Sequence, residues 1–86
     1  MELEGELLEA VERVIVTPAA GVFVAVEPMP HVVEVGSTIG YVQSAEVVTP
    51  VKSPFTGHFV SLVASTGERL RLHQRVGWLR VDQRDC

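Results

Sequence analysis

Residues 17–24 read TPAAGVFV, and residues 53–60 read SPFTGHFV. Both stretches fit the pattern S/T-P-x-x-G-x-F-V. The prolines (18 and 54), the glycines (21 and 57) and the phenylalanines (23 and 59) are each 36 residues apart. A second echo follows at an offset of 37, where residues 39–42 read IGYV and residues 76–79 read VGWL. A repeat at a fixed period indicates that one supersecondary unit occurs twice.

Each residue of the repeated motif has a physical role in a turn that leads into a strand. Proline fixes φ and removes a backbone donor, glycine permits a positive φ or a close backbone approach, and phenylalanine fills the core. Neither half can bury its apolar face alone, but two halves packed about a pseudo-twofold axis can form a flattened barrel-like sandwich. The turn and motif residues expected to set the fold are Pro18, Gly21, Phe23, Gly36, Pro54, Gly57, Phe59 and Gly67.

Short valine-rich runs, each broken by glycine or proline, continue from Val14 onward. This pattern is typical of many short strands joined by tight turns. We therefore predict an all-β domain over residues 14–82, a flattened barrel or sandwich of two quasi-symmetric four-stranded halves, with a C-terminal tail at 83–86. The expected strands are Val14–Thr17, Gly21–Val26, Val32–Val35, Ile39–Gln43, Val47–Val51, Gly57–Val63, Leu70–Leu72 and Val76–Val81.

The first residues follow a different period. Apolar residues recur there at helical spacing, with glutamates between them: Leu3, Leu7, Ala10, Val11 and Val14. This spacing predicts a short amphipathic helix, so residues 1–13 are expected to form an N-terminal helix or tail. The helix would either cap one end of the sheet or dock onto a partner protein, with Leu3, Leu7 and Val11 as the candidate docking residues.

The composition limits the classes of function. The chain has 86 residues, enough for one domain, and a formal net charge of −4, which disfavours nucleic-acid binding because phosphates require a basic face. Cys86 is the only cysteine, so an internal disulfide and a cysteine-based zinc site are excluded. No apolar run is long enough to span a membrane, and the acidic start is unlike a secretory signal. We expect a cytoplasmic protein.

The order of these motifs resembles the biotinyl/lipoyl-domain family, in particular the biotinyl domain of the biotin carboxyl carrier protein of acetyl-CoA carboxylase. The resemblance rests on the opening Thr17–Phe23, the stretch Pro30–Ile39 before a hairpin, and Thr66–Leu70 after it. It covers about Val14 to Val81. It implies two quasi-symmetric sheets and a hairpin between the halves that presents a biotinylated lysine in the motif E-A-M-K-M.

The resemblance places five residues of this chain at the attachment hairpin, and none of them matches the signature. They are Gln43, Ser44, Ala45, Glu46 and Val47. Biotinylation and lipoylation both form an amide, in which a lysine amine attacks an acyl-adenylate. Glu46, at the lysine position, has no amine, and its carboxylate would yield only a labile anhydride. The sequence therefore predicts that neither biotin nor lipoate is attached at this hairpin.

Other candidate sites have weaker support. Lys52 is the only lysine, and it is expected either as an exposed charge at a strand end or as an unconventional attachment site. The three histidines, His31, His58 and His73, are dispersed and show no metal-binding or catalytic spacing. Four arginines between Arg69 and Arg80 form a local basic stripe, which is expected to be the solvated side of two strands.

Three functions follow from the sequence. The first is a carrier-like interaction subunit without a cofactor, structural or regulatory, in an acyl-CoA carboxylase or a related biotin-dependent complex. The second is a true carrier modified at Lys52. The third is a hammerhead-like accessory domain of a transport or adaptor complex. Catalysis by the chain itself is not expected, because no acid, base and nucleophile converge in the pattern. Self-association through Val47 and Val48 is a further expectation.

Overall fold

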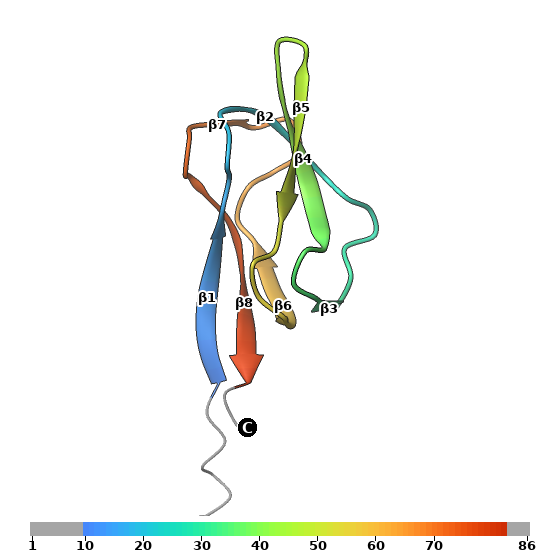
Figure 1. Ribbon diagram of the computed structural model, residues 1–86, viewed down its shortest axis with the longest axis vertical. Helices are drawn as coiled ribbons and strands as arrows, with labels where there is room; N and C mark the ends of the chain where they lie inside the picture. The colour runs from blue at the N-terminus through green and yellow to red at the C-terminus, as the bar shows by residue number, and fades with distance from the viewer. Residues whose placement is uncertain (1–9, 83–86) are drawn as a thin grey trace, which may run out of the picture.

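The computed structural model describes residues 10–82 and consists of two antiparallel sheets (Figure 1). The strands are β1 (Ala10–Val16), β2 (Gly21–Ala25), β3 (Val32–Val33), β4 (Thr38–Ser44), β5 (Val47–Lys52), β6 (Gly57–Leu62), β7 (Arg69–Leu70) and β8 (Arg75–Asp82). One sheet, here sheet A, has the order β1-β8-β6-β3, and sheet B has the order β5-β4-β2-β7. The predicted all-β class is confirmed.

The core lies between the two sheets. Sheet A contributes buried Ile15, Val33, Val76 and Leu79, and sheet B contributes Phe23, Ala25, Ile39, Val42, Val51 and Leu70. Each sheet keeps two edge strands, β1 and β3 in one and β5 and β7 in the other. The fold is therefore an open sandwich. The sequence predicts a flattened barrel or a sandwich, and residues 10–82 do not form a closed barrel.

The predicted helix over Leu3–Val14 is wrong for its described part, because Ala10–Val16 forms β1. This strand pairs with β8 from Ala10 opposite Asp82 to Val16 opposite Arg75. The segment is rich in β-branched residues, which favour a pleated surface, and long-range pairing outweighs the helical spacing. Val11 thus belongs to an edge strand opposite Val81, whereas Leu3 and Leu7 lie outside the described residues.

The two halves of the chain are related by a pseudo-twofold exchange. Replacing β1–β4 by β5–β8, and the reverse, converts the strand order of sheet A into that of sheet B. The backbone follows the same relation: the Phe23 amide donates to Glu68 O at 2.9 Å, and the Phe59 amide donates to His31 O at 2.8 Å. The quasi-symmetry expected from the repeated motif is thus present in both the topology and the hydrogen bonds.

Thr17 and Ser53, which open the two copies of the motif, are both buried polar residues. Each hydroxyl donates at 2.6 Å to the carbonyl two residues on, that of Ala19 or Phe55. Each also accepts the amide of that same residue at 3.2 Å. This local turn satisfies the buried hydroxyl, which explains why the motif begins with serine or threonine.

One pair of equivalent turns differs in its residue at positive φ. Gly36, at φ 90, donates its amide to Ser53 O, and His73, at φ 67, donates its amide to Thr17 O. Both residues occupy the third position of a turn closed by a bond from the fourth amide to the first carbonyl, where a type II turn requires positive φ. Glycine meets this requirement without strain, and histidine does not.

We predict that His73→Gly raises the free energy of unfolding by about 0.5–1 kcal/mol, because relief of the positive φ exceeds the added entropy of the unfolded chain. Urea unfolding followed by Trp78 fluorescence measures this change. The control is Leu72→Gly at the neighbouring exposed position, which has no positive φ and should lose about 0.5–1 kcal/mol. A destabilised His73→Gly protein would contradict the prediction.

Candidate functional site: the β4–β5 hairpin

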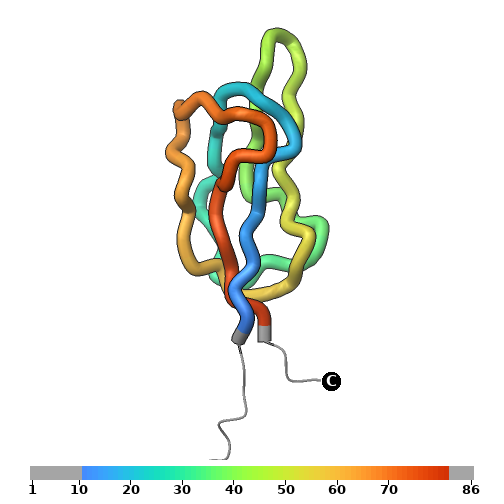
Figure 2. Tube along the Cα trace, turned by 90° about the vertical axis from the view of Figure 1, so that its left-hand side faces the viewer, coloured from blue at the N-terminus to red at the C-terminus, as the bar shows by residue number. Residues whose placement is uncertain are grey.

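The β4–β5 hairpin projects beyond the other turns at one end of the molecule (Figures 1 and 2). The start of β1 and the end of β8 lie at the opposite end. The strands pair from Thr38 opposite Lys52 to Ser44 opposite Val47, which leaves Ala45 and Glu46 as a two-residue turn. Residues 43–47, which the resemblance assigns to the attachment hairpin, therefore lie at the tip of this hairpin; their correspondence to an attachment site stays a prediction.

The base of the hairpin is fixed by the core. Phe23 is fully buried, and its ring occupies the space that a side chain at Gly40 would need: a Cβ there would lie 2.5 Å from Phe23 Cε1. Val42 is the last buried residue of β4, and every residue from Gln43 to Val48 is exposed. The tip is thus an exposed extension on a rigid base, a geometry suited to presenting side chains to another molecule.

The tip offers apolar contact on both faces. Val47 is 61% exposed and Val48 is 55% exposed, and consecutive strand residues point to opposite faces. Tyr41, lower on β4, is 40% exposed and lies opposite Pro50. Between Gln43 and Val48 the only charged residue is Glu46. An exposed apolar tip with one carboxylate suits a protein contact better than it suits covalent chemistry.

The turn itself is conformationally unusual. Ala45 has φ 53, a region that non-glycine residues occupy at some cost. Two-residue hairpin turns require a positive φ at the first turn position because this matches the twist of the strands. The backbone of Ala45 therefore presents Glu46 as the second residue of a tight turn.

Lys52 does not reach this tip. It is exposed and pairs with Thr38 at the far end of β5, six residues after Glu46, or about 20 Å along an extended strand. It precedes the buried residue Ser53. The pairing register thus keeps Lys52, the only lysine, away from the hairpin tip, where the resemblance predicts the attachment position.

The residues of the repeated motif and of the turns lie at strand starts, in the core or in turns. Gly21 and Gly57 begin β2 and β6, and each lies where a Cβ would collide with a backbone oxygen of the neighbouring strand, that of Gln43 or Arg80. Phe23 is buried and Phe59 is half-buried against the core. The remaining motif residues, Pro18, Gly36, Pro54 and Gly67, occupy exposed turns.

The candidate polar sites are dispersed. His31, His58 and His73 are all exposed, and within residues 10–82 no three His, Cys, Asp or Glu side chains gather closely enough to share a metal ion. From the basic stripe, Arg80 forms an ion pair with Glu12 at 3.3 Å. The same residues contain no helix that could cross a membrane.

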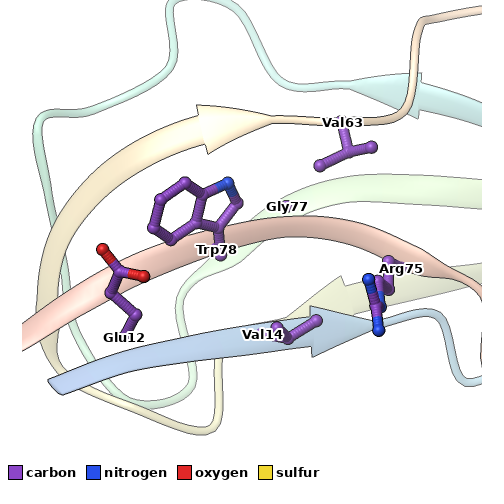
Figure 3. Close-up of a pocket in the computed structure, with 6 residues that line it drawn as sticks. All are labelled: Glu12, Val14, Val63, Arg75, Gly77 and Trp78. Carbon is purple, nitrogen blue, oxygen red and sulfur yellow. The ribbon is translucent and has the colours of Figure 1, made fainter.

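Sequence reasoning missed a groove on the outer face of sheet A. It is open, has a volume of about 370 Å³, and contains the indole of Trp78. Figure 3 shows Glu12 at one end, Arg75 at the other, and Val14 and Val63 on the two sides. The residues of this Trp78 groove are Glu12, Val14, Val63, Arg75, Gly77 and Trp78. They come from β1, β8 and the residue that follows β6, so only strand pairing brings them together.

Neither a protein-family model nor a curated protein matches this chain.

Proposed function

We propose that this protein is a carrier-like interaction subunit without a cofactor, structural or regulatory, in an acyl-CoA carboxylase or a related biotin-dependent complex. One observation carries the proposal. An exposed two-residue turn stands at the end of a pseudo-twofold sandwich, and Glu46 is its second residue. The sequence resemblance implies that a carrier would have its lysine at this position. The fold presents a side chain as a carrier does, but the side chain has no amine to acylate.

The exposed valines support a protein partner for this hairpin. A surface that receives a carrier hairpin must accept a narrow two-stranded tip, and Val47 and Val48 supply apolar contact on both of its faces. Glu46 adds one negative charge at the extreme end, which a basic group of the partner would complement. Occupying a carrier's place without carrying biotin would lower the number of active arms in the complex.

A carrier modified at Lys52 is the second candidate, because Lys52 is exposed. In that case a ligase would have to accept a strand end whose next residue is buried in a turn. The interaction-subunit proposal requires no such unusual ligase. The two candidates predict different intact masses, because only a modified carrier has an added biotinyl or lipoyl group.

Purification of the tagged protein from its native host tests the proposal. We expect carboxylase or carboxyltransferase subunits to be recovered with a bait of unmodified mass. The Val47→Ser/Val48→Ser variant should lose these partners and remain folded, because substitutions at exposed positions have small effects on stability. The matched control is Val32→Ser/Val35→Ser, which removes two equally exposed valines away from the hairpin and should retain them.

Two results would contradict the proposal. Recovery of transport or adaptor components in place of carboxylase subunits would favour the hammerhead-like accessory role. An added biotinyl or lipoyl mass on the bait would favour a true carrier, and loss of that mass on Lys52→Arg would locate the attachment site.

A further inference from the structure

The open edge of β1 differs from the other sheet edges in the described part of the chain. β3 and β7 are only two residues long, and β5 contains Pro50, whose missing N–H interrupts the row of edge donors. β1 has seven residues and contains neither proline nor glycine. Its far edge, on the outside of the molecule in Figure 1, pairs with no strand between residues 10 and 82. Alternate amides and carbonyls of β1 therefore point toward a place where another strand can bind.

The side chains of β1 also favour a further strand. Four of its seven residues are β-branched and fit a pleated surface: Val11, Val14, Ile15 and Val16. Val14 and Val16 are 46% and 43% exposed on the outer face of sheet A. The half-buried indole of Trp78 lies beside Val14 on β8. A strand added at this edge would extend sheet A and cover part of the exposed valine surface.

The two charged residues of β1 restrict how a second copy of the same strand could pair with it. Opposed residues of a sheet share a face, so an antiparallel pair of identical strands is centred on one residue, which lies opposite itself. Centring on Glu12 or on Arg13 would place two like charges directly opposite each other, which is unfavourable. Centring on Val11 or on Ile15 would leave only three residues of β1 in the pair.

Pairing centred on Val14 avoids both faults and keeps five residues of each strand in the pair. Glu12 then lies opposite Val16 of the second copy. The next side chain along this row is Arg75 of the second copy, which lies opposite that valine on β8. Two strand spacings, about 10 Å, separate the backbones of Glu12 and this arginine, and the two long side chains can span them. The Glu12 carboxylate already pairs with Arg80 at 3.3 Å, and its side chain is still 51% exposed. The charge contact is reciprocal, with one carboxylate and one guanidinium from each copy.

We propose that two copies of this chain associate by antiparallel pairing of their β1 strands, centred on Val14. The two copies of sheet A then form one continuous sheet in the order β3-β6-β8-β1-β1-β8-β6-β3. One strand from each copy is a small contact compared with a standard protein interface, so the dimer is weak and its population depends on protein concentration. The β1 edge is separate from the hairpin tip, and this inference does not depend on the proposed function.

Val14→Lys tests the pairing, because it places two like charges opposite each other at the twofold axis. In sedimentation equilibrium we expect the parent to approach twice the monomer mass as its concentration is raised, and Val14→Lys to keep the monomer mass. The matched control is Val63→Lys, at a position that is 56% exposed on the same outer face but not on β1. This control should dimerise as the parent does. Urea unfolding establishes that both variants are folded.

Cysteine crosslinking tests the register without adding a charge. In a Cys86→Ser background, which removes the only native cysteine, Val14→Cys should form an intermolecular disulfide on brief oxidation with diamide. Residues opposite each other have Cα atoms about 4.5–5.5 Å apart, within the reach of a disulfide. Val16→Cys should not crosslink to its own copy, because the register separates these two residues by four positions, or about 13 Å.

Three results would overturn the proposal. A parent that stays monomeric at every concentration would leave the β1 edge to a strand of another protein. Loss of the dimer in Val63→Lys as well as in Val14→Lys would assign the contact to the outer face of sheet A. Crosslinking of Val16→Cys as fast as that of Val14→Cys would show that the strands do not pair in this register.

Discussion

Gly21→Ala is expected to lower the free energy of unfolding by about 3 kcal/mol or more, a large share of the roughly 5–15 kcal/mol typical of a domain. Two costs coincide at this position. The backbone has φ 149, which L-residues rarely adopt, and a Cβ would collide with the carbonyl oxygen of Gln43. That oxygen belongs to the neighbouring strand β4, so relief requires the sheet to move rather than a side chain to turn.

Substitutions at two further glycines allow the cost of the positive φ and the cost of the Cβ collision to be measured separately. Gly67 has φ 96, and a Cβ added there would meet no atom within 4 Å, so Gly67→Ala should lose only about 1–2 kcal/mol from backbone strain. Gly57, the counterpart of Gly21, has no positive φ, but its Cβ would lie 2.5 Å from Arg80 O. We expect Gly57→Ala to fall between the other two in urea unfolding. A loss at Gly21 as small as that at Gly67 would show that close strand approach does not limit this fold.

Much of the fold could be predicted because its constraints are local. The pattern of proline, glycine and phenylalanine recurs at a fixed period, and each of these residues restricts the backbone or the core directly. The hairpin could be located for the same reason, since its short strands are flanked by the two copies of the motif. The structure places Ala45 and Glu46 at the tip of that hairpin, and its equivalence to an attachment hairpin stays a prediction.

Pairing between distant segments could not be predicted in this way. Val11 and Val14 fit helical spacing when taken with Leu7, yet they belong to β1 because β8, more than 60 residues later, supplies the pairing partners. The helix expectation failed at this point. Short apolar runs are ambiguous between helix and strand, and the sequence alone does not decide which long-range partner is available.

The Trp78 groove was missed for the same reason. Val14, Val63 and Trp78 meet only through the β1–β8 and β6–β8 pairs, which join distant parts of the sequence. In the repeat, Trp78 is the counterpart of Tyr41, the equivalent aromatic in the first half. That comparison does indicate an outward position, because Tyr41 is 40% exposed on the outer face of sheet B.

Conversion of the hairpin tip to the carrier signature should create a biotin acceptor. The five changes are Gln43→Glu, Ser44→Ala, Ala45→Met, Glu46→Lys and Val47→Met. All five positions are exposed, and Ala45→Met keeps a Cβ where one already exists, so the domain should remain folded. The new lysine amine can attack biotinyl-adenylate, form the amide and release AMP, because the turn presents it at the end of the molecule.

The matched control retains Glu46 and carries the other four changes, so that it differs from the converted protein by a single side chain. Urea unfolding establishes that both variants are folded before either is treated with ligase. Any modification of the control would have to occur elsewhere, and Lys52 is the only other lysine in the chain.

The most direct measurement is the intact mass of the parent, the control and the converted protein after incubation with a biotin protein ligase, ATP and biotin. We predict one added biotinyl group on the converted protein and none on the other two. Biotinylation of the parent, or a folded converted protein that stays unmodified, would contradict the claim that this is a carrier-type scaffold that lacks only its acceptor lysine signature.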